Sequence, residues 1–325
     1  MKKIFALLIL SVALTSCYND YIKDYDYSAV YFAYQFDVRS LVVGEGMKVD
    51  IGATLGGIMV NGIDRNVNFK LDNTLITADM LTKMQASTEP HIKAAVSLVT
   101  TLLPLPANYY TLSNTGTMVI KANQHSGTVR LTVDSTRFLS DPATIRSTYV
   151  LPFYITTADA DSIIEPKRYN VVGIKYENML FGNYLHGGVT TVKDATGTTI
   201  QTTAYVTAVN QTSTQIWTLT TAAPNAVVSN GYSNQTSTTR QELKLTLNGT
   251  DITVGTATGA TNTYQANGAS TYNNAKLLQN RMILLNYKYV VGTDTYYCQD
   301  TLTFRNRIRD GVSEWQDENP SHYLK

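Results

Sequence analysis

The sequence predicts a mainly β protein with two β domains: an N-terminal immunoglobulin-like antiparallel sandwich with one inserted helix, and a C-terminal antiparallel sandwich or barrel. Three observations support this fold class. Short runs of alternating apolar and polar residues recur along the chain and end at Gly, Asn or Asp, as half-buried strands do. One segment has the apolar spacing of a helix. The composition changes after residue 176, from where Thr, Asn, Gln, Ser and Gly become frequent.

The first residues have the pattern of a lipoprotein signal peptide. Two lysines precede an apolar run over residues 4–14, which is shorter than the roughly 20 residues of a membrane-spanning helix. Residues 14–17, Leu-Thr-Ser-Cys, resemble the bacterial lipobox, in which the cysteine is lipidated and becomes the first residue. We therefore expect residues 1–16 to be removed, Cys17 to carry the lipid, and residues 17–27 to form a tether to the outer membrane.

Composition and cysteine count limit the possible partners and sites. The 325 residues include 26 Lys and Arg against 25 Asp and Glu, so a nucleic-acid partner is not expected. With Cys17 lipidated, Cys298 has no partner for a disulfide or a cysteine-based metal site. Cys298 shares its strand parity with Leu302 and Phe304, which predicts a small buried side chain. No cofactor is expected, and incidental calcium binding stays open.

Residues 28–176 are expected to form the N-terminal sandwich. Strand-like runs occupy residues 28–34, 48–53, 67–71, 117–120, 128–133, 149–156 and 169–176. The inserted helix is expected to start with Thr88 as its cap and Pro90 in its first turn, and to stop before Pro104. Its apolar stripe, which we expect to pack onto the sandwich, comprises Ile92, Ala95, Val96, Val99, Leu102 and Leu103.

Residues 177–325 are expected to form the second β domain, with residues 177–183 as the junction. Strand candidates occupy residues 201–209, 214–221, 242–247, 251–254, 281–291 and 295–305. Gly292-Thr293-Asp294, between the last two, predicts a tight hairpin.

A series of apolar and tyrosine-rich motifs follows the lipobox in a characteristic order. These motifs are "AVYFAYQFDVRSL", "VLPFYITTADADSIIEPKRYNVVGIKYEN", "GNYLHGG" and a final hairpin ending "DTLTFRNR". The order resembles a family of two-domain surface lipoproteins of gut Bacteroidetes and covers nearly the whole chain after Cys17. The resemblance implies an N-terminal β-sandwich of unknown function, a second β domain, and a role in polysaccharide utilisation beside outer-membrane glycan importers and secreted glycoside hydrolases.

Acidic residues follow the expected lipidation site. In the family that the sequence resembles, such residues are associated with export to the cell face, and Asp20, Asp24 and Asp26 match this pattern loosely. The resemblance therefore implies a lipid-anchored protein that faces the cell exterior, with an outer-membrane glycan importer complex as its candidate partner. A periplasmic orientation is the alternative.

Aromatic residues in polar loops of the second domain are the candidate glycan-binding residues. Rings stack on the apolar face of a sugar while amides and carboxylates bond to its hydroxyls, and binding residues concentrate on loops held by a rigid scaffold. The candidates are Tyr232, Tyr264, Tyr272 and Trp315. By contrast, Tyr287 and Tyr289 alternate with aliphatic residues along a strand and are expected in the core, as is Trp217.

The sequence shows no catalytic signature, so no catalytic residue is assigned. The four histidines are isolated, and no nucleophile elbow, phosphate loop or dinucleotide fingerprint is present. Asp159 and Asp161 have a spacing compatible with glycoside hydrolysis, but a surface turn is the expected interpretation. We therefore expect a non-enzymatic protein that binds a glycan in polysaccharide capture. A cell-surface adhesion or assembly subunit is the first alternative, and an unrecognised glycoside hydrolase the second.

Overall fold

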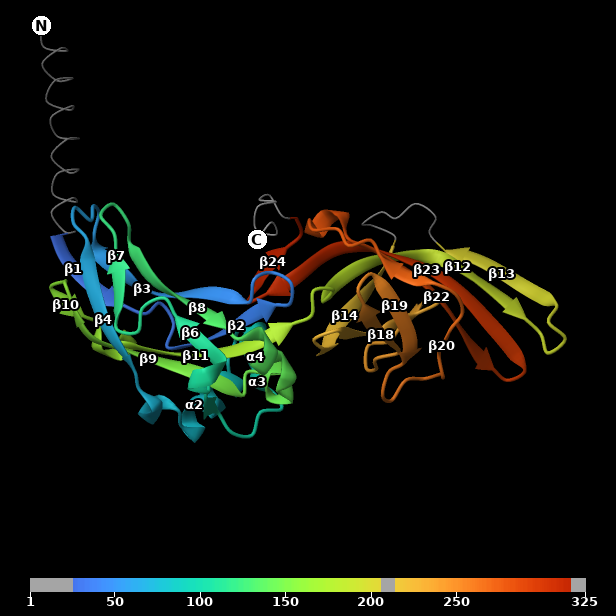
Figure 1. The fold of residues 1–325 in the computed structure, drawn as a ribbon, viewed down its shortest axis with the longest axis horizontal. Helices are drawn as coiled ribbons and strands as arrows, with labels where there is room; N and C mark the ends of the chain where they lie inside the picture. The colour runs from blue at the N-terminus through green and yellow to red at the C-terminus, as the bar shows by residue number, and fades with distance from the viewer. Residues whose placement is uncertain (1–25, 206–213, 317–325) are drawn as a thin grey trace, which may run out of the picture.

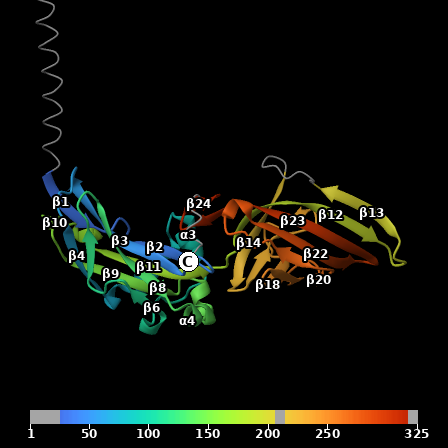
Figure 2. The ribbon, with the colours of Figure 1, turned by 45° about the horizontal axis from the view of Figure 1, so that its top comes forward.

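The protein consists of two β domains that lie end to end (Figures 1 and 2). The structure is a computed structural model and describes residues 26–205 and 214–316. The expected signal peptide, the expected lipidation site Cys17 and nearly all of the expected tether therefore lie outside the described residues. Strands dominate both domains, which confirms the predicted fold class.

Among the described residues, no helix is both long and apolar enough to cross a membrane.

The N-terminal domain is a sandwich of two facing sheets. One sheet has the order β10 (Ser162–Ile163), β1 (Asp26–Tyr31), β3 (Lys48–Ile58), β8 (Ser126–Val133), β6 (Tyr110–Leu112). The other has the order β2 (Phe36–Val42), β11 (Tyr169–Glu177), β9 (Tyr149–Ala158), β4 (Arg65–Leu71), β7 (Thr117–Ile120), with β5 (Leu103–Pro104) beside β9. Most neighbours are antiparallel, but β1–β10, β2–β11 and β5–β9 are parallel.

Alternation within the strands builds the core of this sandwich. In β8, every second residue is buried, so Val129, Leu131 and Val133 face the opposite sheet. Their partners across the layer include Phe153 and Val172. Because successive side chains point to opposite faces of a strand, this alternation determines which face of each strand lies inside.

Three short helices lie beside the sandwich, where the sequence predicted one. They are α2 (Ala78–Gln85), α3 (Pro90–Val96) and α4 (Ser135–Ser140). α2 and α4 were missed because they have only eight and six residues, too few for a clear apolar repeat. Both have a side-chain cap, from Thr77 and Asp134 respectively.

Helix α3 begins at Pro90 as predicted, but its cap and its end differ from the prediction. The residue before the helix is Glu89, not Thr88, and the helix ends at Val96. The following Thr and Val residues disfavour a helix, and Leu103 is drawn into β5, where its N–H donates to Thr148 O at 2.9 Å. The rest of the stripe is buried as predicted, apart from the half-exposed Leu103.

The C-terminal domain is a single sheet whose strand pairings return to their starting strand. The order around this closed sheet is β12 (Gly182–Lys193), β14 (Gln215–Ala223), β15 (Ala226–Ser229), β18 (Leu243–Asn248), β19 (Asp251–Thr256), β21 (Ser270–Tyr272), β22 (Met282–Val291), β23 (Asp294–Arg309). The ring closes because β12 pairs with β14 on one edge and with β23 on the other. Past the end of β14, β12 pairs instead with β13 (Thr199–Tyr205).

Smaller strands complete this domain. They are β16 (Gly231–Tyr232), β17 (Gln235–Thr236), β20 (Gln265–Ala266) beside β22, and β24 (Val312–Glu314) beside β23. Between β22 and β23, Val291 pairs with Asp294, so Gly292 and Thr293 make the predicted tight hairpin. Gly292 has a φ of 61°, a conformation that favours glycine.

The closed sheet encloses an aromatic core around Trp217. Trp217, Tyr287, Tyr289 and Cys298 are all buried, as predicted. Gly231 lies directly against the indole: a Cβ on it would come within 2.3 Å of the Trp217 ring. A residue without a side chain is therefore required where β16 crosses the tryptophan.

Candidate functional site

The domains are connected by a short buried segment between β11 and β12. Asn178 and Leu180 in this segment are fully buried. The Asn178 amide donates to Pro224 O at 2.8 Å, and its Oδ1 accepts from the Leu180 N–H at 2.9 Å. The segment is therefore fixed to the C-terminal domain by its own side chain.

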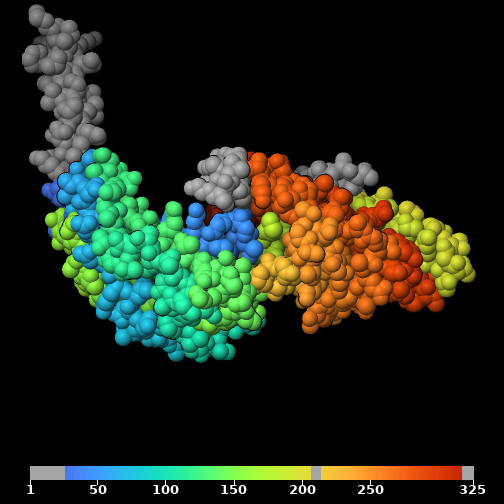
Figure 3. Space-filling view, in the orientation of Figure 1, coloured from blue at the N-terminus to red at the C-terminus, as the bar shows by residue number. Residues whose placement is uncertain are grey.

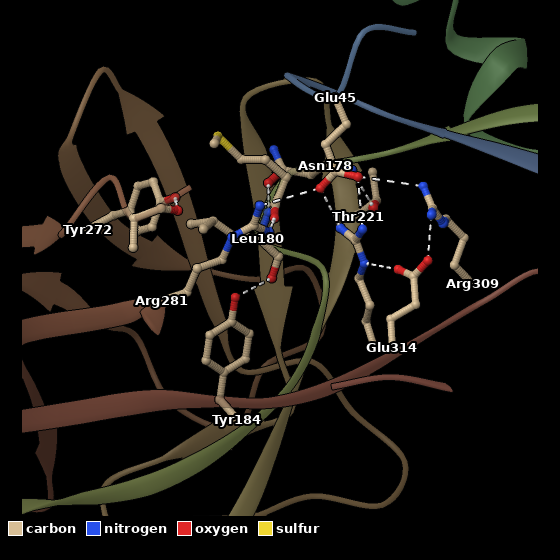
Figure 4. A network of polar contacts seen from close by, with 12 residues as sticks. Glu45, Asn178, Leu180, Tyr184, Thr221, Tyr272, Arg281, Arg309 and Glu314 are labelled. Carbon is tan, nitrogen blue, oxygen red and sulfur yellow. Dashed lines mark hydrogen bonds and ion pairs between the residues drawn. The ribbon is translucent and has the colours of Figure 1, made fainter. Parts of the chain in front are cut away.

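A cluster of charged residues lies against the same junction (Figure 4). Glu45, in the turn between β2 and β3, accepts two hydrogen bonds of 2.8 Å from Arg307 on β23. Arg281 and Arg309 reach the same carboxylate at 3.3 and 3.5 Å. Burial alone would raise the pKa of Glu45, but Arg307, with Arg281 and Arg309, lowers it overall. We call these residues the Glu45 clamp.

A second polar cluster lies inside the closed sheet, around Asp300. The Asp300 carboxylate accepts hydrogen bonds from Tyr205 Oη at 2.8 Å and Tyr287 Oη at 2.6 Å. His186 Nε2 lies 3.1 Å from the same carboxylate, and its ring stacks on Trp217. Burial, together with the charge of Asp300, raises the pKa of both tyrosines, so they keep their protons and donate.

Cys298 belongs to this buried cluster. Its Sγ lies 3.4 Å from Thr190 Oγ1, which in turn bonds to Ser233 Oγ at 2.8 Å. Burial and the charge of Asp300 raise the pKa of Cys298 to about 11, so the thiol stays protonated. The cluster is thus a hydrogen-bonded part of the core. The described residues contain no group of three or more His, Cys, Asp or Glu side chains arranged to hold a metal ion.

A crevice of about 340 Å³ lies between the two domains. Three of its charged groups have partners within the protein: Lys175 pairs with Glu177, and Asp310 accepts from the Ser40 N–H at 2.9 Å. Burial raises the pKa of Asp310. The Nδ1 atom of His91, which also lines the crevice, is buried without a hydrogen-bond partner among the described residues.

An open groove of about 390 Å³ lies between β22 and the segment that leads into β20. We call it the amide groove. Its lining residues are Thr261, Asn262, Thr263, Gln265, Lys288, Tyr289 and Val290. The side chains of Thr263, Gln265 and Lys288 form no hydrogen bond or ion pair with another residue that the structure describes. Their polar groups are therefore available to a ligand.

Three of the four predicted glycan-binding aromatics are core residues. Tyr232, Tyr264 and Tyr272 are only 9%, 3% and 2% exposed, and all belong to the core of the closed sheet. Each hydroxyl donates to a protein acceptor, namely Gln235 Oε1, Glu242 Oε2 and Ala275 O. A tyrosine with a satisfied hydroxyl gains more by burying its ring than by exposing it. The prediction that these rings offer stacking surfaces is wrong.

Trp315 differs from the three tyrosines because it is 60% exposed. It follows β24 at the domain junction, whereas β20 lies farther from the junction (Figures 1 and 2). The structure therefore brings no predicted aromatic into the amide groove. Asn262 and Gln265, which do line it, flank Tyr264 in the same "TNTYQANG" segment. The polar composition of this loop correctly indicated a solvent-facing segment, but the side chains that line the hollow are the neighbours of the tyrosine.

Comparisons with known proteins support the fold and the N-terminal domain. A family model described as "-like, N-terminal domain" matches residues 21–162. No curated protein matches the chain. A crystal structure of a Bacteroides ovatus protein of unknown function is similar with 20% identity and a TM-score of 0.63, covering 90% of this chain and 98% of that one. A second Bacteroides ovatus structure of unknown function has 14% identity, a TM-score of 0.40 and coverages of 90% and 97%.

The first of these matches shows a shared two-domain fold, since it extends over nearly the whole of both chains. Together with the N-terminal family model, it supports the resemblance to a Bacteroidetes protein family at the level of the fold.

Proposed function

We propose that this protein is an outer-membrane lipoprotein that faces the cell exterior and binds a glycan, without catalysing a reaction, in polysaccharide capture. The observation that carries the proposal is the amide groove, where hydroxyl, amide and ammonium groups without internal partners line one open hollow. An outer-membrane glycan importer is the partner that this role would require.

The chemistry of the amide groove suits a neutral sugar. Thr263 and Gln265 offer both donors and acceptors, and Lys288 offers donors only, which together match the hydroxyls of a glycan. No carboxylate lines the groove, so it lacks the pair of acids that glycoside hydrolysis uses. Tyr289, buried and stacked on Tyr296 at 4.8 Å, forms part of the floor beneath these groups. The closed sheet holds the groove in one geometry, which favours binding.

The groove predicts a specific loss of glycan binding. In affinity gels cast with a panel of neutral polysaccharides, at least one should retard the purified protein. The triple variant Thr263→Ala, Gln265→Ala, Lys288→Ala should weaken that binding by about tenfold or more, because each lost hydrogen bond contributes about 0.5–1.5 kcal/mol. The matched control Thr199→Ala, Gln201→Ala, Lys244→Ala changes the same residue types at exposed positions of the same domain. Equal weakening in both variants, or no retardation by any polysaccharide, would contradict the proposed site.

The lipid anchor is tested separately. Cells grown with an alkyne-tagged fatty acid should label the wild-type protein, whereas Cys17→Ala should remain unlabelled and leave the membrane fraction. This loss is expected because the variant would carry none of the acyl chains that lipobox processing attaches, and stable anchoring needs more than one chain. Labelling of the Cys17→Ala variant would contradict lipidation at this residue.

A role in adhesion or assembly is the second candidate, and one observation favours it. β13 pairs with β12 along one edge and with no other strand among the described residues, and most of its side chains are exposed. A free strand edge can accept a strand from another chain. Clustering of cells that carry the protein, unaffected by the groove variant, would favour this alternative.

A further inference from the structure

The loop between β3 and β4 exposes three large apolar side chains within five residues. Met59, Val60 and Ile63 are 54%, 73% and 58% exposed. We call these three residues the apolar tip. Polar residues usually fill such loops, and a local concentration of exposed apolar side chains marks an interaction surface.

Hydrogen bonds fix this loop in a conformation that buries a polar side chain and exposes apolar ones. Asn61, between the apolar residues, is fully buried. Its side-chain amide donates to Lys121 O at 2.9 Å and to Gln124 O at 3.0 Å, and its Oδ1 accepts from Arg65 Nε at 2.9 Å. The polar side chain is thus held inside, and its apolar neighbours are held outside. Local disorder does not explain this exposure, because the loop is pinned by the turn between β7 and β8.

The apolar tip lies where the chain enters the fold. Asp26, the first residue of β1, pairs with Ile58, the last residue of β3. Cys17 lies 26 − 17 = 9 residues before Asp26, a length that spans at most about 30 Å when fully extended. A lipid at Cys17 would therefore keep the tip close to the bilayer. This end of the N-terminal domain points away from the C-terminal domain (Figures 1 and 3).

The cations beside the tip are engaged by acceptors of the protein itself. Lys121 pairs with Asp64 at 2.7 Å, and Arg65 donates to two neutral acceptors, Asp159 O at 2.7 Å and Asn61 Oδ1 at 2.9 Å. Attraction to anionic lipid headgroups would need unpaired cations, which this surface does not concentrate. A contact with lipid would instead be driven by removing apolar side chains from water.

We propose that the apolar tip inserts Met59, Val60 and Ile63 into the surface of the lipid bilayer beside the anchor and so fixes how the protein stands on the membrane. The proposal rests on the proposed lipid anchor. The acyl chains would hold the protein at the membrane, and the tip would add a second point of contact that restricts rotation about the tether. The C-terminal domain and its amide groove would then be directed away from the lipid.

The test uses residues 18–325, which lack both Cys17 and the apolar run over residues 4–14, so that vesicle binding depends on neither the lipid nor the signal peptide. Val60→Trp places a fluorescent reporter in the tip, and Val312→Trp, at a position 62% exposed in β24, is the matched control. With phosphatidylcholine vesicles, the Val60→Trp emission should shift to the blue and be quenched by brominated lipids, whereas the control should show neither effect. Adding Met59→Ser and Ile63→Ser should lower vesicle partitioning by about tenfold.

Several outcomes would overturn the proposal. One is the absence of a blue shift with vesicles, and another is equal quenching at position 312. A blue shift without vesicles, accompanied by dimerisation, would mean that a second copy of the chain covers the tip. Binding that falls steeply between about 0.05 and 0.5 M salt would mean that charge drives it. Failure of fatty-acid labelling at Cys17 would instead contradict the anchor and leave the vesicle result standing.

Discussion

Replacing Glu45 by alanine should lower the free energy of unfolding by about 3 to 5 kcal/mol, because removing one partner of a buried ion pair leaves the other charge without compensation. Arg307 and Arg281 are almost completely buried, and Glu45 neutralises both of them from the other domain. Glu314 would remain beside Arg307, but it also binds Arg309. We therefore expect the domain junction to loosen as well as to lose stability.

Calorimetry and small-angle scattering measure these two effects. Glu45→Ala should lower the melting temperature and increase the radius of gyration. The control is Asp50→Ala, which breaks a bidentate pair with Arg130 on the exposed face of the sandwich and should change stability by less than about 1 kcal/mol. Comparable effects of both substitutions would show that the Glu45 clamp contributes no more than a surface ion pair.

The clamp also predicts part of the pH dependence of stability. The pKa of Glu45 is lower in the folded protein than its ordinary value of 4.5, so below that ordinary value the unfolded chain binds more protons than the folded one. The stabilisation by this carboxyl is complete above its unfolded pKa and is lost as the pH falls through its folded pKa. Unfolding of Glu45→Ala should therefore depend less steeply on pH in the acid range than unfolding of the wild type.

Replacing Asp300 by alanine should have the second large effect, a loss of about 3 to 5 kcal/mol. Two tyrosine hydroxyls, those of Tyr205 and Tyr287, would lose their acceptor inside the closed sheet, and each unsatisfied buried donor costs about 1 to 3 kcal/mol in addition to the cavity. Trp217 reports this loss, because its indole is buried beside His186 in the same cluster. Its fluorescence during urea unfolding therefore follows the C-terminal domain.

A double-mutant cycle separates the hydrogen bond from general damage to the core. Tyr287→Phe should destabilise the wild type, but should cost much less when Asp300→Ala is already present, because the two groups contact each other. Asp251→Ala, at an exposed position of β19, is the control and should change stability by no more than about 0.5 kcal/mol. Equal costs of Tyr287→Phe in both backgrounds would contradict the coupling.

Local patterns predicted the strands and much of the core because these properties depend on neighbouring residues. The alternation that placed Tyr287, Tyr289 and Cys298 inside requires only the period of a strand. The same reasoning could not show that β12 pairs with β23, since those strands are more than 100 residues apart in sequence and many partners fit their patterns equally well. Closure of the sheet was therefore visible only in the structure.

The candidate site illustrates a related limit. The polar composition of the loop around Tyr264 correctly indicated a solvent-facing segment, but composition does not specify which way a side chain points. Tyr264 turns inward, where its hydroxyl donates a hydrogen bond to Glu242, some 20 residues earlier in the sequence. The Glu45 clamp was missed for the same reason: its acid and its three arginines are brought together only by the docking of two domains.

The long strand β12 also determines how the protein would respond to a pulling force. It follows β11 after a short buried segment, so tension applied to the C-terminal domain would pass along the backbone from one sheet into the other. Between Asn183 and Lys193, β12 is paired with β23, and hydrogen bonds of an antiparallel pair lie perpendicular to the strands. A pull along β12 would load these bonds together in shear and not one after another. The junction is therefore arranged to carry load between the two domains.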